Sequence, residues 1–168
     1  KNEKLKHTIV LGGLLMVMIA EYRNVDWVKP FEISAEIKQF YSWLNQQAEV
    51  KVIVELPIAN DLTNSSGWER SSYDDGQYLL YATLHNKALV NGHHSFIPGE
   101  VLRLGTRLTA NFPTREKVDE LRQMGVGVIT VHEEEFADRR VGEKVINELR
   151  ELGIEEAYNQ GGLHGFRL

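Results

Sequence analysis

The chain has 168 residues, of which 42% are hydrophobic and 26% charged, and its formal net charge is −5 at pH 7. This length suits one domain of ordinary size, and the composition excludes disordered, collagen-like and wholly membrane-embedded chains. The acidic balance, with no basic stripe interleaved with aromatic residues, excludes a nucleic-acid partner, and the absence of cysteine excludes disulfides, thiolate nucleophiles and cysteine metal sites.

Residues 8–20 form an uncharged apolar run near the N-terminus. Lysines precede the run and acidic residues follow it, an asymmetry that places the rest of the chain outside the cytoplasm. The run is shorter than the roughly 20 residues that cross a bilayer, although residues 5–22 reach a marginal length if a flanking lysine snorkels. A transmembrane helix, a signal peptide and a buried element of a soluble fold remain open, and we favour the transmembrane helix.

The remaining chain alternates between predicted helices and strands. We expect a helix capped by Ser34, a strand over 51–57, a loop over 59–76, a helix over 78–85, a strand over 88–92, helices from Pro98 and after Thr114, a strand over 126–131, a helix ending before Gly153, and a terminal hairpin. This order predicts an α/β fold, a three-layer domain with a mainly parallel sheet and a C-terminal hairpin.

Polar residues follow two of the predicted strands. Glu55 lies near the end of the first, and His132 and Glu133–Glu135 follow the second. Ligands of open α/β sheets bind beyond the carboxyl ends of the strands, so these groups are candidates to face one crevice. The alternative interpretation is that the glutamates form a solvated helix start, which the helix dipole favours.

Other signals for chemistry are weak. Six histidines invite a metal site, but His93 and His94 are adjacent and no HExxH or equivalent spacing occurs, so we expect no metal and no cofactor. Ser95 lacks the GxSxG elbow of a serine hydrolase, and the glycines at 12 and 13 lack a phosphate-binding motif.

The segment 78–99 is the richest in side chains that bind polar ligands. Tyr, His, Lys, Asn and Ser alternate there with apolar anchors, a pattern typical of a site for a carbohydrate or a polar head group. The alternative is that the aromatic residues belong to the core and Asn91–Gly92 to a turn. The candidate ligand-binding residues, including two after the strand 126–131, are Tyr78, His85, Lys87, Asn91, His93, Ser95, His132 and Glu133.

Four segments match one family pattern in order and spacing. They are VIVELP at 52–57, YLLYATLHNKALVNGHHSFIP at 78–98, NFP at 111–113 and LRQMGVGVITVH at 121–132. The chain thereby resembles the C-terminal extracytoplasmic domain of polytopic membrane glycosyltransferase-like proteins of the GT-C type. His85, Lys87, Asn91, Gly92, Phe96 and Pro98 match the pattern, whereas Ala82, Ala88 and His93–Ser95 depart from it.

The resemblance implies a division of the chain at the cell membrane. Residues 1–29 would be the last transmembrane helix and a linker, and residues 30–168 an α/β domain outside the cytoplasm. GT-C enzymes transfer a sugar from a polyprenyl-phosphate donor and use an acidic base in an early extracytoplasmic loop, which these residues do not include. We therefore expect this chain alone to be catalytically inactive.

The expected function is accessory: the domain contacts an acceptor glycan or a polyprenyl-phosphate sugar, or braces the membrane part. Its expected partners are membrane lipid, that glycan or lipid-linked sugar, and the remainder of a polytopic membrane protein. One alternative is an independent hydrolase or metal-dependent enzyme anchored by a single helix, with His85, His93, His132 and Glu133 as its working groups. Another is a structural or protein-binding domain.

Overall fold

The computed structural model describes Met16 and residues 32–58, 75–90 and 105–168. The chain divides into two compact units, Lys1–Ile33 and Ser34–Leu168. Apart from Met16, which is helical, the apolar run at 8–20 lies outside the described residues. Within the described ranges, no helix has both the length and the apolar character needed to cross a membrane. The expected transmembrane helix therefore stays a prediction.

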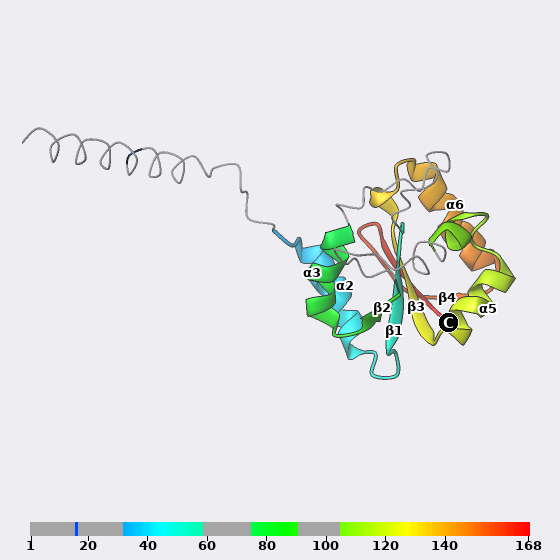
Figure 1. Ribbon diagram of the computed structural model, residues 1–168, viewed down its shortest axis with the longest axis horizontal. Coiled ribbons are helices and arrows are strands. Elements are labelled where there is room, and N and C mark those ends of the chain that lie inside the picture. Colours follow the sequence, from blue (N-terminus) through cyan, green and yellow to red (C-terminus); the bar gives the residue numbers. More distant parts are fainter. Residues whose placement is uncertain (1–15, 17–31, 59–74, 91–104) are drawn as a thin grey trace, which may run out of the picture. The chain divides into compact units, whose positions relative to one another are not determined.

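The described part of Ser34–Leu168 is built on a five-stranded sheet (Figure 1). Its strands are β1 (Val52–Leu56), β2 (Ala88–Leu89), β3 (Val126–His132), β4 (Glu155–Gln160) and β5 (Leu163–Arg167). They lie in the order β2-β1-β3-β5-β4. Strand β1 pairs in parallel with β2 and β3, whereas β5 is antiparallel to β3 and β4.

The α/β class is confirmed, but the expected mainly parallel sheet is wrong: the sheet is mixed. The predicted C-terminal hairpin is present, and both of its strands extend the sheet beside β3. Two strands joined by a two-residue turn must run antiparallel. Gly161 and Gly162 make that turn with φ angles of 61° and 73°, which glycine adopts without strain.

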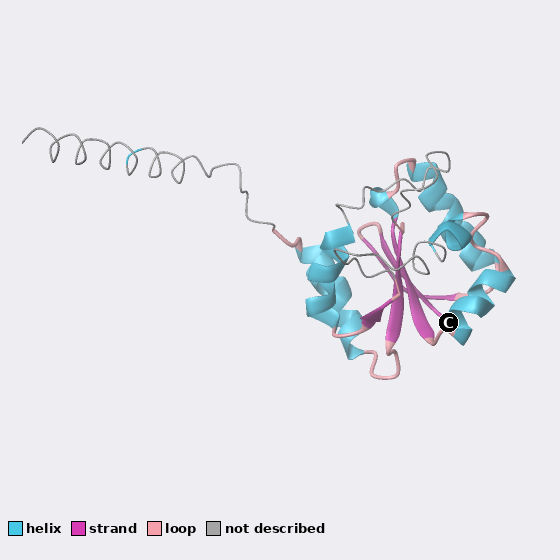
Figure 2. Cartoon of the chain, in the orientation of Figure 1, coloured by secondary structure: helices cyan, strands magenta, loops and turns pink. Residues whose placement is uncertain are grey.

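Helices lie on both sides of the sheet (Figure 2). On one side are α2 (Ala35–Gln46) and α3 (Asp75–His85), and on the other α5 (Arg115–Gln123) and α6 (Arg139–Glu151); the short 3₁₀ helix η2 (Glu133–Glu135) follows β3. Ser34 and Thr114 cap α2 and α5 as predicted, because their side chains accept hydrogen bonds from Ile37 N and Lys117 N. Pro98 lies outside the described residues, but 105–109 of the helix expected there are helical.

Successive side chains of β1 and β3 point to opposite faces of the sheet, so each face has its own buried layer of side chains. The apolar core under α5 and α6 takes Val54 and Leu56 from β1 and Ile129 and Val131 from β3. The intervening side chains point toward α2 and α3 instead. These include Glu55, which is the register partner of Thr130 on β3, and His132. The sheet therefore presents a polar row to one helical layer and an apolar row to the other.

Candidate functional site

A buried carboxylate–imidazole pair lies between β1 and β3. Glu55 Oε2 is 2.8 Å from His132 Nε2, and the two side chains are 0% and 2% exposed. Thr130 Oγ1 also donates to Glu55 Oε2, and the Tyr41 hydroxyl donates to Glu55 Oε1 over 3.0 Å. Both oxygens of the carboxylate thus accept hydrogen bonds inside the protein.

These hydrogen bonds fix the protonation of the pair. Burial opposes ionisation of Glu55, but the hydrogen bonds from His132 and Thr130 outweigh it and hold the pKa of the carboxyl below its ordinary value. An ionised carboxylate can only accept, so the proton lies on His132 Nε2 and is donated to Glu55. The pKa of Tyr41 is raised well above its ordinary value by burial and by Glu55, which keeps its hydroxyl a donor.

A second carboxylate faces the other ring nitrogen. His132 Nδ1 lies 3.5 Å from Glu135 Oε1, and Glu135 Oε2 accepts a hydrogen bond of 2.9 Å from the Tyr78 hydroxyl. The rings of Tyr78 and Tyr81 flank the imidazole, with centroids 5.0 and 6.1 Å away, and Tyr81 is parallel to it within 8°. His132 is therefore held by carboxylates at both nitrogens and by aromatic rings at its faces.

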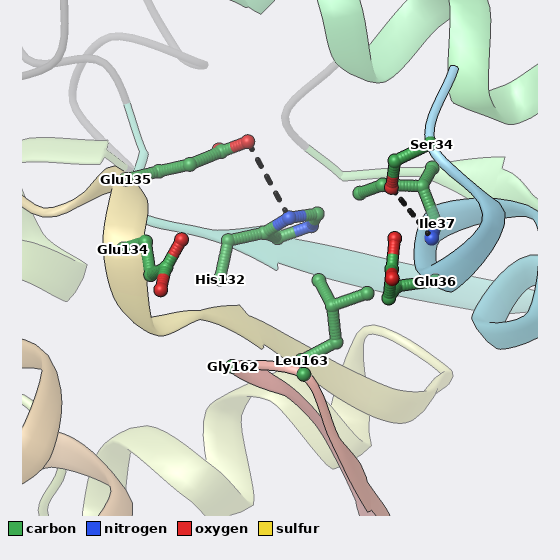
Figure 3. Close-up of a pocket in the computed structure, with 9 residues that line it drawn as sticks. Ser34, Glu36, Ile37, His132, Glu134, Glu135, Gly162 and Leu163 are labelled. Atoms are coloured by element: carbon green, nitrogen blue, oxygen red, sulfur yellow. Dashed lines mark hydrogen bonds and ion pairs between the residues drawn. The ribbon is translucent and has the colours of Figure 1, made fainter.

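A cavity of about 420 Å³ opens beside His132 (Figure 3). Its walls come from three places: the start of α2, the end of β3 with η2, and the turn of the β4–β5 hairpin. The lining residues are Ser34, Glu36, Ile37, His132, Glu134, Glu135, Gly161, Gly162 and Leu163. The site lies beyond the carboxyl end of β3, where ligands of α/β sheets are expected.

The structure brings together some of the residues chosen from the sequence. Tyr78 and His132 lie in the buried cluster, and the expected convergence of the ends of β1 and β3 is found. His85 is fully buried and stacks on Tyr41, with ring centroids 5.2 Å apart. Its Nδ1 accepts from Lys87 N over 2.9 Å, and its Nε2 has no hydrogen-bond partner among the described residues.

Other chosen residues lie elsewhere. Lys87 directs Nζ to the Gln47 carbonyl oxygen, 2.8 Å away at the end of α2. Glu133 turns away from the cavity, and its Oε1 accepts from Arg139 Nε over 2.9 Å. The remaining candidates, Asn91, His93 and Ser95, fall outside the described residues.

A second polar cluster ties the hairpin to its neighbours. His164 Nδ1 lies 2.7 Å from Glu156 Oε1, and its Nε2 lies 3.4 Å from Glu133 Oε2. Arg150 on α6 donates twice to Glu156, each time over 2.8 Å. Burial opposes ionisation of Glu156, but the hydrogen bonds from Arg150 and His164 lower the pKa of its carboxyl. All of these groups are paired with each other, so we assign this cluster a structural role.

Sequence reasoning missed Tyr41 and Thr130 as members of the site, whereas Glu135 was one of the glutamates expected either at the crevice or at a solvated helix start. Tyr41 lies on α2 between the buried Phe40 and Leu44 and is itself 0% exposed, so its position alone is typical of a core residue. A signal for Thr130 existed, because Glu55 interrupts an apolar strand and Thr130 and His132 occupy alternate positions of another. Polar residues at alternate positions of a buried strand indicate that one face of the sheet is polar.

No known family, curated protein or solved structure matches the chain. The site must therefore be judged by its own chemistry. Within the described ranges, no group of three His, Asp or Glu side chains is arranged to hold a metal ion. What the site offers is a concave surface of carboxylates, one oriented imidazole and adjacent aromatic rings.

Proposed function

We propose that the domain at residues 30–168 binds a polyhydroxylated ligand, the acceptor glycan or the lipid-linked sugar of a membrane glycosyltransferase-like protein. The observation that carries this proposal is the cavity beside the buried Glu55–His132 pair. Sugar hydroxyls donate hydrogen bonds, and the cavity offers carboxylates and an imidazole to accept them. Its volume of about 420 Å³ lies within the range of small-ligand sites.

The arrangement favours binding because the polar groups are already held in place. Tyr41 and Thr130 fix Glu55, Glu55 fixes the ring of His132, and Tyr78 fixes Glu135. Groups held in this way lose little freedom when a ligand docks. In this proposal the reaction itself belongs to the membrane part of the protein, and the domain positions the glycan or braces that part.

Binding is tested by filling the cavity. Ile37 lines it and Lys38 is its exposed neighbour on α2, so Ile37→Trp and Lys38→Trp form a matched pair. Titration calorimetry of the 168-residue chain with a panel of mono- and disaccharides should show binding that Ile37→Trp abolishes and Lys38→Trp retains. Thermal unfolding checks that both variants fold. If no saccharide binds the unaltered chain, the proposal is overturned.

The membrane context needs its own experiment. A reporter that is active only outside the cytoplasm, fused after Leu168 in the full-length protein, should be active. Activity of a cytoplasmic reporter at the same position would contradict the proposed topology. In that protein, His85→Ala and Asn91→Ala should reduce sugar transfer, and unchanged transfer would assign both residues to structure.

A second candidate function is acid–base catalysis by the domain alone. It is favoured by one observation: Glu55 holds His132 at Nε2 and leaves Nδ1 on the opposite edge of the ring, toward Glu135. A carboxylate-oriented imidazole is a common general base. A hydrolase screen of the isolated chain, with metal analysis, separates the candidates, because the binding proposal predicts neither turnover nor bound metal.

A further inference from the structure

Most of the polar side chains that line the cavity can only accept hydrogen bonds. Glu36, Glu134 and Glu135 are carboxylates, and an ionised carboxylate has no hydrogen to donate. Ser34 Oγ accepts from Ile37 N as the cap of α2, and its own hydroxyl hydrogen is directed at the Glu36 carboxylate. Three of the four ionisable groups in the wall are therefore negative, and a ligand there must supply the hydrogen-bond donors.

The exception, His132, adds no free donor. Its Nε2 proton is directed at Glu55, away from the ligand. Its Nδ1 carries a lone pair in the neutral ring, and in the charged ring it carries a proton that is directed at Glu135 Oε1, 3.5 Å away. In both protonation states the carboxylates outnumber the imidazole, so the wall stays negative. The buried Glu55 thus sets which ring nitrogen meets the cavity.

The two arginines of α6 that interact with the glutamates of η2 are held in ion pairs. Among the described residues that line the cavity, none is Lys or Arg. Arg139 pairs with Glu133 and Glu143, and Arg150 pairs with Glu156. The start of α2 is the positive end of a helix, but Glu36 in its first turn already meets that charge. An anion entering the cavity would find these partners occupied.

We infer that the cavity selects a sugar carrying a free, positively charged amino group over a neutral sugar, and a neutral sugar over a phosphorylated one. This inference rests on the proposed function, because it names the ligand class of the same site. An ammonium group supplies three donors and a positive charge to a wall of carboxylates. Hydroxyls supply donors without charge, and a phosphate adds acceptors and negative charge to a site that already has both.

The test is calorimetric titration of the 168-residue chain with glucosamine, glucose and glucose 6-phosphate at neutral pH. Glucosamine should bind about fivefold more tightly than glucose, the fold-change typical of one partly exposed ion pair. Glucose 6-phosphate should bind most weakly. The advantage of glucosamine should shrink at high salt, because exposed charges are then screened.

Matched variants locate the effect. Glu36→Gln and Glu134→Gln each remove one negative charge from the wall but keep an acceptor oxygen, so each should weaken glucosamine by roughly two- to fivefold more than it weakens glucose. Glu151→Gln removes an exposed carboxylate outside the wall, at the end of α6, and should change neither. Equal melting temperatures would show that all three variants fold.

The outcomes separate this inference from the proposed function. Equal affinity for glucosamine and glucose, tightest binding of glucose 6-phosphate, or a glucosamine advantage that survives both substitutions would overturn the charge preference and leave polyol binding intact. Failure of all three sugars and of the wider saccharide panel to bind would overturn both.

Discussion

Glu55 and His132 meet across two neighbouring parallel strands, with Glu55 Oε2 2.8 Å from His132 Nε2. Glu55 is in register with Thr130, so His132 stands two residues further along β3 on the same face. Both side chains are shielded from water. Glu55 is hydrogen-bonded to His132, Tyr41 and Thr130, and His132 contacts Glu55 and Tyr41. Removing one partner takes a charge-assisted hydrogen bond from the other at a site closed to water, which is costly.

We expect Glu55→Gln to lower the free energy of unfolding by about 3 kcal/mol, because it neutralises one member of a buried pair. Glu120→Gln is the control, since Glu120 pairs at the surface with Arg107, whose side chain is 64% exposed. The control should lower the free energy of unfolding by less than about 1 kcal/mol. Urea unfolding at neutral pH measures both. Equal effects would mean that the Glu55 pair contributes no more than a surface ion pair.

Tyr41→Phe removes the hydroxyl that donates to Glu55 Oε1. A hydrogen bond to a buried charged group contributes about 1.5–3 kcal/mol, so a loss in this range is expected. Tyr158→Phe is the matched control, because its hydroxyl donates over 3.4 Å to the neutral amide oxygen of Gln160 on the edge strand β4. Chemical denaturation should separate the two variants by more than about 1 kcal/mol. Similar losses would argue against a Tyr41–Glu55 bond.

Acid should destabilise the domain in two steps. Burial, which outweighs the opposing effect of Glu55, lowers the pKa of His85 from 6.5, and hydrogen bonds lower that of Glu55 from 4.5. In both cases the unfolded chain takes up the proton first, so stability is lost as pH falls. The His85 contribution is lost below pH 6.5 and the Glu55 contribution below pH 4.5.

Unfolding free energies across this pH range check the assignment. His85→Gln should flatten the upper step and keep the lower one. Glu55→Gln should flatten the lower step and enlarge the upper one, because Glu55 opposes the lowering of the His85 pKa. If His85→Gln left the upper step unchanged, His85 would titrate alike in the folded and unfolded chains.

Gly165 on β5 has no room for a side chain. A Cβ there would lie 2.8 Å from two ring carbons of Trp43 and 3.3 Å from the Cβ of Tyr158. Gly165→Ala should therefore cost about 1–3 kcal/mol through overpacking. The double variant with Trp43→Leu tests the cause, because the alanine should cost less once the indole is gone. An unchanged cost would point to the strand backbone instead.

The sequence predicted the elements whose signals are local. Ser34 and Thr114 are caps as expected, and the hairpin glycines make the expected turn. The direction of each strand in the sheet depends on contacts between segments that are distant in the sequence. The order of helices and strands favoured a mainly parallel sheet, but the hairpin docks on β3 through β5, which runs antiparallel to both β3 and β4. Where a hairpin docks depends on the packing of β5 against β3, for which composition and periodicity carry no signal.

The candidate site was predictable in part for the same reason. The ends of β1 and β3 were expected to meet, and Glu55 and His132 do. Tyr41 could not be singled out, because a tyrosine on the apolar face of a helix looks like a core residue until its hydroxyl is placed against a carboxylate. Glu133 and Glu135 are neighbours but diverge, since the tight turn of η2 sends one to Arg139 and the other to His132.

The hairpin turn at Gly161–Gly162 makes one wall of the cavity, and its Gly162 carbonyl also accepts from Glu133 N over 2.9 Å. This wall comes from a single short stretch of chain with strands on either side that fix its position. Residues inserted between the two glycines would alter the shape of the cavity while the pairing of β4 with β5 is kept. The turn is thus a place where ligand preference can change independently of the buried Glu55–His132 pair.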